Sequence, residues 1–218
     1  MRMILAFWLM LAGPALGQEA RGAPPGRFDF YVLALSWSPT HCADPDNRAR
    51  DALQCTGSRP FGFIVHGLWP QYERGYPRLC PTRERGPDSQ TVRSMLAVMP
   101  DRDLVWKQWE RHGACSGLTA PAYFATVRAA RATVTIPMAF VSPQGWRTVT
   151  AGEVERAFRD ANPGLGADAI AVEGRRRNLG EVRICLTRDL ARFRACPQVD
   201  QGGLTAQARL AVPPARGG

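Results

Sequence analysis

The chain of 218 residues is 45% hydrophobic and 22% charged, which predicts a folded protein with a sizeable core and excludes a disordered one. Its formal net charge of +9 favours a polyanionic partner, with RNA, DNA, sulfated sugars and anionic membranes all admissible. Lys107 is the single lysine among 28 basic residues. So strong a preference for arginine also indicates a compositional bias, which explains part of the charge without any partner.

Residues 1–17 predict a signal peptide. Arg2 supplies the positive start, residues 3–11 the apolar core, and residues 15–17 a small-residue cleavage site. The alternative is a membrane anchor, although the apolar run is short for a bilayer span. We therefore expect a periplasmic or secreted protein that is not associated with a membrane after cleavage.

Six cysteines fit export to an oxidising compartment, where disulfides form. They contain no CxxC pair, and the three histidines are widely spaced, so a zinc site is not expected. Many pairings are possible, and the sequence alone does not choose among them. Spacing favours three bridges, namely Cys42–Cys55, Cys185–Cys196 and, from the remaining two, Cys80–Cys115.

The first part of the mature chain alternates between loop-like and apolar stretches. Residues 18–27 are rich in glycine, proline and charge and predict a mobile lead-in. Residues 28–37 are apolar and aromatic and predict a central strand. A polar loop with His41 follows as far as Gly57. A lone histidine in such a loop is more often structural than catalytic, so we leave His41 out of the predicted site.

Helical periodicity and capping residues mark most of the rest. They predict helices at residues 88–98, from Asp101 or Asp103 to Gly113, at 121–132 and at 151–160. Strands are predicted at 169–172 and 181–186 around a basic turn, and residues 201–218 predict a loose tail. The sequence shows neither a repeat nor a domain linker. We therefore expect one α+β domain at residues 28–200, with a mostly antiparallel central sheet packed with several helices and stapled by disulfides.

The stretch FIVHGLWPQ, residues 63–71, combines an apolar strand with a titratable ring and a flat indole. Residues 63–65 predict the strand, His66 stands at its end, and Gly67 allows a turn. Trp69 then offers an apolar face near the imidazole. This pair suits a site that holds an aromatic ligand and transfers a proton beside it. Taken singly, a histidine in an apolar strand is more often structural, and a tryptophan more often belongs to the core.

A second stretch, WKQWERHGAC at residues 106–115, predicts a polar helical face. Lys107 and Arg111 lie four residues apart, as do Gln108 and His112, so the two pairs form adjoining columns. Together with His66, these groups form the set that RNA cleavage requires: a base for the 2′-hydroxyl proton, cations for the phosphate and an acid for the leaving 5′-oxygen. The nucleophile lies on the RNA, so neither a metal nor a cofactor is expected. Taken alone, the two cations fit a solvated helix face equally well.

These two segments resemble the active-site segments of the secreted ribonuclease T2 family, whose first segment commonly reads HGLWP. The stretch LALSWSP at residues 33–39 and the terminal cysteine pair are also similar to the family. The resemblance implies a bacterial endoribonuclease of the acid type that cleaves single-stranded RNA by transphosphorylation to 2′,3′-cyclic phosphate ends. Weak base preference is expected, because stacking on an aromatic ring accepts any base. We expect a monomer.

The resemblance also implies roles for individual residues. His66 becomes the general acid and His112 the general base. Trp69 stacks on the base 5′ of the scissile bond, with Gln71 and Tyr76 beside it.

The second segment departs from the usual family pattern, which is His-Glu-x-x-Lys-His-Gly. Lys107 replaces a phosphate-binding histidine, Gln108 a glutamate and Arg111 a lysine. Lys107 and Arg111 keep a positive charge for the phosphate. Gln108 can hydrogen-bond a phosphoryl oxygen or the base histidine, but it cannot exchange a proton. We therefore expect a working ribonuclease with a lower rate and a changed pH profile.

Two other classes of protein stay open. A catalytically attenuated RNA-binding or toxin-like protein derived from the family would explain Gln108, although both histidines argue against it. A basic, disulfide-stapled surface binder would explain the charge and the cysteines but leaves the paired histidine segments without a reason.

Overall fold

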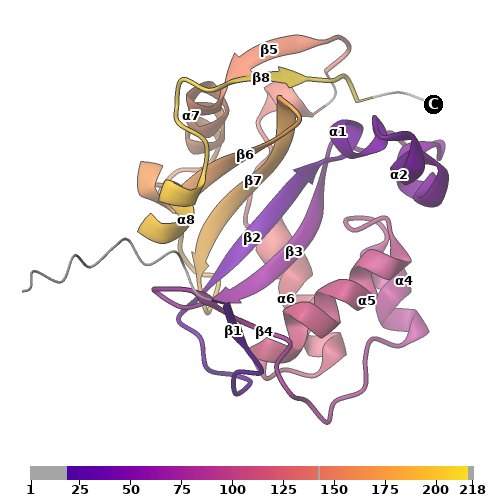
Figure 1. Cartoon of the computed structure of the whole chain (residues 1–218), viewed down its shortest axis with the longest axis vertical. Coiled ribbons are helices and arrows are strands. Elements are labelled where there is room, and N and C mark those ends of the chain that lie inside the picture. Colours follow the sequence, from indigo (N-terminus) through magenta and orange to yellow (C-terminus); the bar gives the residue numbers. More distant parts are fainter. Residues whose placement is uncertain (1–18, 142, 216–218) are drawn as a thin grey trace, which may run out of the picture.

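The computed structural model describes residues 19–141 and 143–215, and the predicted signal peptide lies outside the described residues. Within them the chain forms a six-stranded sheet and a separate two-stranded one (Figure 1). The strands are β1 (Glu19–Arg21), β2 (Phe30–Trp37), β3 (Phe63–Gln71), β4 (Tyr76–Arg78), β5 (Arg147–Thr150), β6 (Ile170–Arg175), β7 (Asn178–Thr187) and β8 (Arg209–Val212).

Strand β2 lies at the centre of the larger sheet because it is apolar on both faces and buried along nearly its whole length. It pairs antiparallel with β3 on one side and with β7 on the other. Strand β6 is antiparallel to β7, and β5 is antiparallel to β8. A single parallel pair of residues, Asn178 and Ala211, joins β7 to β8. The prediction of an α+β domain with a mostly antiparallel sheet is thus confirmed.

Strand β3 is longer than the sequence predicts, and Gly67 is not a turn. Ala34 of β2 pairs with Gly67 and the next residue, Leu35, pairs with Val65, so His66 is the extra residue of a β-bulge. The strand continues through Pro70. Proline has no backbone N–H, and an edge strand tolerates it where no N–H is needed for pairing. The structural requirement for glycine at position 67 is space: a Cβ there would lie 2.2 Å from Oε1 of Gln108.

Each of the four larger helices begins at a capping residue, and three of these caps, Asp88, Asp101 and Thr150, are ones that the sequence suggests. Asp88, Asp101, Thr119 and Thr150 each accept a backbone N–H bond at a helix start, and Thr150 also forms a reciprocal capping box. These helices are α4 (Ser89–Met95), α5 (Arg102–Arg111), α6 (Ala120–Ala132) and α7 (Ala151–Ala161). Figure 1 shows α4, α5 and α6 gathered on the β3 side of the sheet, with α7 and the short α8 (Pro197–Gly202) on the β6 side.

The end of one predicted helix and one predicted loop are wrong. Helix α5 does not reach Gly113, because His112 leaves helical geometry at φ −132° and ψ −45° and a 3₁₀ turn, Gly113–Ser116, follows. The predicted polar loop after β2 is instead three short helices, α1 (Ser38–Cys42), α2 (Pro45–Arg50) and α3 (Ala52–Cys55). Prolines in the first turns of α1 and α2 and the Cys42–Cys55 bridge stabilise this compact unit.

The described parts of both predicted flexible ends are ordered by pairing. In the lead-in, β1 runs parallel to β4, and the N–H of Gly26 donates to the carbonyl of Cys115. In the tail, β8 pairs with β5, and the carbonyl of Pro213 accepts the indole N–H of the buried Trp37 at 3.1 Å. Sequence composition misled here, because strand pairing with distant segments orders both ends and, in the tail, buries Leu210 and Val212 in the core.

All three favoured disulfides are present, and the described residues contain no free cysteine. Cys185–Cys196 joins the end of β7 to the start of α8, and Cys80–Cys115 joins the segment after β4 to the turn after α5. Bridges of this kind fit an oxidising compartment. Among the helices of residues 19–141 and 143–215, none is long and apolar enough to cross a membrane.

Candidate active site

The ring of Trp69 lies next to both predicted catalytic histidines. Its centroid is 5.4 Å from that of His66, with the rings edge to face, and 5.4 Å from that of His112, with the planes 34° apart. The fold thus brings together the two segments, which lie about forty residues apart in the chain and come from β3 and the end of α5.

Local structure explains why each histidine is accessible. The β-bulge turns His66 out of the regular alternation of β3, so its side chain is 38% exposed although the strand around it is buried. His112 lies one residue beyond α5, where the backbone N–H still bonds to the carbonyl of Gln108. The N–H of Leu79 donates to the carbonyl of Arg111, and the nearby Cys80–Cys115 bridge fixes the end of the helix against β4.

His66 is paired with a carboxylate that the sequence analysis missed. Its Nδ1 lies 2.5 Å from Oε2 of Glu181, a residue of β7. Ser36 of β2 donates its hydroxyl to the same oxygen at 3.2 Å, and Nε of Arg183 donates to Oε1 at 2.8 Å. A signal was present in the sequence: a glutamate in a strand whose other residues are mostly apolar needs a buried partner.

Glu181 remains ionised in this setting. Burial alone would raise the pKa of Glu181, but the hydrogen bonds and positive charges of His66 and Arg183 outweigh it, and the pKa lies below its ordinary value. The site therefore contains a fixed negative charge next to one of its two histidines.

His112 has the opposite environment. Burial lowers the pKa of His112 to about 3, with further lowering by the positive charges of His66, Arg78 and Arg111. Its Nδ1 is buried and has no hydrogen-bond partner among the described residues. At neutral and mildly acidic pH this imidazole is uncharged and able to accept a proton.

Gln108 has a different role from the one the sequence predicts. It is buried, and its Oε1 accepts a hydrogen bond from Nε1 of Trp69 at 2.9 Å. The expectation that Gln108 shares an open face with Lys107 is therefore wrong. Neighbouring residues of a helix point in different directions around its axis. Gln108 therefore points toward β3, while Lys107 and Arg111 are exposed.

Two pockets meet at this site. The first, of about 280 Å³, brings together the predicted base-contacting residues with His112. It is lined by Val32, Trp69, Gln71, Tyr76, Arg78, Arg111, His112, Arg183 and Val199. The guanidinium of Arg183 lies 5.3 Å from the ring centroid of Trp69, a cation–π distance.

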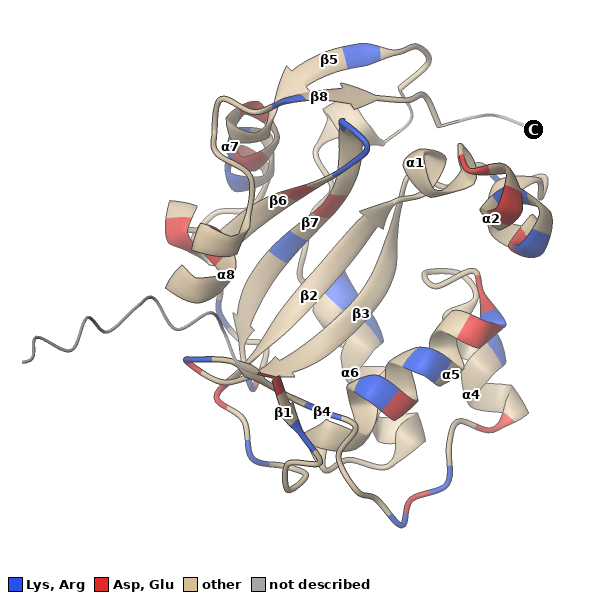
Figure 2. Cartoon of the chain, in the orientation of Figure 1, with Lys and Arg blue, Asp and Glu red and all other residues tan. Residues whose placement is uncertain are grey.

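The second pocket, of about 560 Å³, is lined by His66, Lys107 and Glu181. Lys107 and Arg111, the two predicted phosphate-binding cations, therefore face different pockets. Arg183 lines both pockets and joins them. Figure 2 shows basic positions on α5 and at the tip of the β6–β7 hairpin, with acidic positions on the neighbouring parts of β6 and β7.

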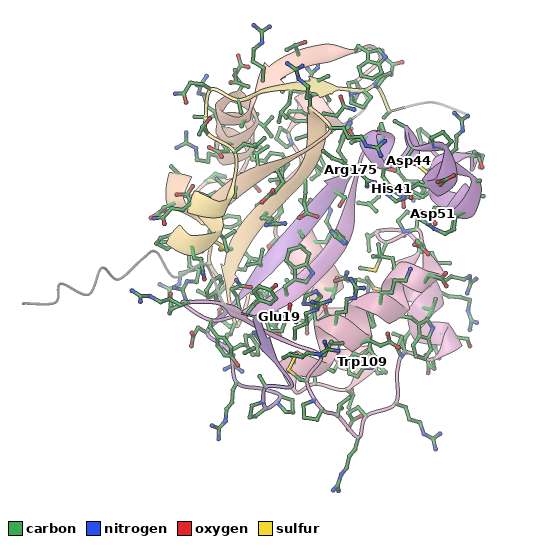
Figure 3. The ribbon with its side chains drawn as sticks, viewed as in Figure 1. Glu19, His41, Asp44, Asp51, Trp109 and Arg175 are labelled. Atoms are coloured by element: carbon green, nitrogen blue, oxygen red, sulfur yellow. A yellow bond between two sulfur atoms is a disulfide. The ribbon has the colours of Figure 1, made fainter. Side chains whose placement is uncertain are left out.

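His41, which is left out of the predicted site, also lines the second pocket. Its Nε2 lies 2.6 Å from Oδ2 of Asp51. Figure 3 shows His41 and Asp51 together in the α1–α3 unit, and Asp44 close to Arg175 at the hairpin tip, where their ion-pair distance is 3.9 Å. These contacts give the second pocket a fixed wall opposite α5.

A comparison with protein families identifies the family of this chain. Residues 28–196 match the model of the ribonuclease T2 family, and the chain therefore belongs to that family. Among curated relatives, a ribonuclease of Aeromonas hydrophila is 47% identical over 54% of this chain and 48% of its own length. Ribonuclease I of Escherichia coli strain K12 is 25% identical over 75% of this chain and 77% of its own length.

The match to the Aeromonas protein spans about half of that relative, and the match to a probable ribonuclease of Haemophilus influenzae spans 43% of it. Solved structures share the fold. RNase NT in complex with 5′-AMP superposes with a TM-score of 0.65 at 22% identity, over 86% of this chain and 99% of that one. An RNase-related protein from Calystegia sepium superposes with a TM-score of 0.63 at 20% identity, over 87% of this chain and 99% of that one.

Proposed function

We propose that this protein is a secreted or periplasmic endoribonuclease that cleaves single-stranded RNA by transphosphorylation. The observation that carries the proposal is the contrast between the two histidines that lie next to Trp69. His112 is uncharged, as a general base requires, whereas His66 is bonded to an ionised carboxylate that can orient it as a proton donor.

In this reaction His112 removes the proton of the 2′-hydroxyl, and the 2′-oxygen attacks the adjacent phosphorus. The bond from phosphorus to the 5′-oxygen breaks, and protonated His66 delivers its proton to that leaving oxygen. The products are a 2′,3′-cyclic phosphate and a free 5′-hydroxyl. Because the nucleophile belongs to the RNA, the reaction needs no bound metal, and DNA is not a substrate.

Cations around the pockets would hold the phosphodiester. Lys107 lines the pocket of His66, and Arg111 lines the pocket of His112, so the phosphate would lie between a compact ammonium and a planar guanidinium. The base 5′ of the scissile bond would occupy the first pocket against Trp69, with Gln71 and Tyr76 beside it. Stacking supports weak base preference.

One observation favours a second candidate, an attenuated RNA-binding protein. The inward-facing position on α5 carries Gln108, which is neutral and already bonded to Trp69, so it neither exchanges a proton nor reaches a phosphate freely. This candidate keeps the basic pockets as an RNA-binding surface and gives up turnover.

Cleavage of a short single-stranded RNA in EDTA, across pH 4 to 8, separates the two candidates. Product masses should show 2′,3′-cyclic ends, and both His66→Ala and His112→Ala should abolish them. Binding of the same RNA without cleavage, by protein with its three disulfides intact, would overturn the endoribonuclease and leave the binding protein. A requirement for added metal would overturn the proposed mechanism.

A further inference from the structure

The bond between His66 and Glu181 joins residues of strands that are not neighbours. Strand β2 separates β3 from β7, so their backbones are about 10 Å apart. Three features allow the two side chains to meet across β2: the bulge that turns His66, the register that places Glu181 directly opposite Ser36, and the small side chain of Ser36. The hydroxyl of Ser36 also donates to Glu181, so the crossing point itself holds the carboxylate.

Each oxygen of Glu181 has its own partners. Oε2 accepts the hydroxyl of Ser36 and is bonded to Nδ1 of His66, while Oε1 accepts a hydrogen bond from Nε of Arg183 at 2.8 Å. Arg183 extends onward to Oε1 of Glu173 at 2.8 Å. This arrangement fixes the carboxylate in one orientation, and the side chain of Glu181 is only 10% exposed.

The charges in this network are balanced only when His66 is protonated. Arg183 stands between two carboxylates, those of Glu173 and Glu181, which leaves one negative charge unmatched. An imidazolium at His66 supplies the missing positive charge. Other ionisable groups line the same pocket without a hydrogen bond to Glu181, namely His41, Arg50, Asp51, Asp101, Lys107 and Arg175.

We propose that Glu181 is the positioning residue of the general acid: it holds Nδ1–H of His66, so that Nε2 carries the proton delivered to the leaving 5′-oxygen. This inference rests on the proposed ribonuclease function. Glu181 does not touch the substrate, and it acts through His66. The carboxylate comes from β7, whereas the inward-facing position of α5 has only the neutral Gln108.

The test combines two substrates with different leaving groups. In RNA the leaving 5′-oxygen is an alkoxide that needs a proton. A nucleoside 3′-(4-nitrophenyl phosphate) instead releases nitrophenolate, which leaves without a proton. Glu181→Gln should lower kcat on RNA by roughly 10- to 100-fold, the usual range for a group that orients a reacting residue, with little change in KM. On the nitrophenyl ester the kcat of the same variant should fall by less than about threefold.

Two further variants serve as controls. Glu84→Gln removes an exposed carboxylate that lines neither pocket and leaves the bond between His66 and Glu181 in place, so its activity on both substrates should stay near that of the wild type. Glu181→Asp should recover part of the loss on RNA, because the charge is kept while the reach is shortened. Equal losses of Glu181→Gln on the two substrates would overturn the proposal, since a role in folding or phosphate binding predicts that result.

Nitrogen NMR of the histidines supplies a readout that does not depend on turnover. In the wild type His66 should show a protonated Nδ1 with a low-field proton resonance, and Glu181→Gln should remove that resonance. An unchanged His66 spectrum in Glu181→Gln would overturn the proposal. If the wild type cleaves neither substrate, the ribonuclease function itself fails, and the spectra alone then decide whether Glu181 fixes the ring.

Discussion

The amide oxygen of Gln108 accepts the indole N–H of Trp69 at 2.9 Å, and this bond joins the two active-site segments directly. Gln108 lies on α5 and Trp69 on β3. Because the ring of Trp69 lies next to both histidines and lines the first pocket, a bond that fixes the ring also fixes the space in which a nucleotide would lie. Four predictions follow from this site and its supports.

Gln108→Glu should change the pH profile. Glutamate keeps an acceptor for Trp69 but adds negative charge near His112, which favours the imidazolium and moves the pKa of His112 up from about 3. A general base must be unprotonated, so the acidic limb of kcat/KM should move to higher pH. The profile of RNA cleavage from pH 3 to 8 measures this shift. Glu110→Gln, an exposed change on the same helix, is the control, and an unmoved acidic limb in Gln108→Glu would contradict the prediction.

Gly67→Ala should destabilise the protein and loosen the site. The new Cβ would lie 2.2 Å from Oε1 of Gln108 and 2.3 Å from Nε1 of Trp69, so the bond between them must break or the strand must shift. Overpacking of this kind costs about 1–3 kcal/mol of unfolding free energy. Urea unfolding measures it. Gly145→Ala, where a Cβ meets nothing within 4 Å, is the matched control, and equal stability of the two variants would argue against this reading.

Stability should fall as the pH is lowered from about 6.5, because of His112. The unfolded chain binds a proton at this residue near its ordinary pKa of 6.5, whereas the folded protein does not until about pH 3. The unfolded state therefore holds more protons in this window, and the free energy of unfolding declines with falling pH by up to about 1.4 kcal/mol per unit.

The slope is measurable by urea unfolding between pH 5.5 and 6.5, above the ordinary pKa values of the carboxylates. His112→Asn should flatten the slope in this interval. Identical slopes for the two proteins would show that His112 is not the group responsible.

Removal of the Cys80–Cys115 bridge should cost more than removal of Cys185–Cys196. The bridges close 35 and 11 residues respectively, and chain entropy assigns them about 4 and about 3 kcal/mol. The first bridge also holds the end of α5, so the double change to alanine should lower activity under conditions where the protein remains folded. Urea unfolding and RNA cleavage measure the two effects, and a larger loss from the Cys185–Cys196 pair would reverse the expected order.

Sequence reasoning succeeded where the signal is local. Caps such as Asp101 and Thr150 mark helix starts because they bond to backbone groups within three residues, and short spacing identified the disulfides Cys42–Cys55 and Cys185–Cys196. The two segments around His66 and His112 also stood out, because rare residue types concentrate there. The composition of the lead-in and the tail was misleading, since strand pairing is decided by distant partners.

The sequence by itself indicated the fold class, favoured the three bridges that the structure contains, and marked the two histidine segments. Tertiary structure alone decided how those histidines differ. Glu181 is more than a hundred residues from His66 and reaches it only because a bulge and the small Ser36 let two side chains meet across β2. His112 is neutral because distant parts of the chain bury it. Proton affinity depends on solvent exclusion and on nearby charge, and both are properties of the folded assembly of strands rather than of any one stretch.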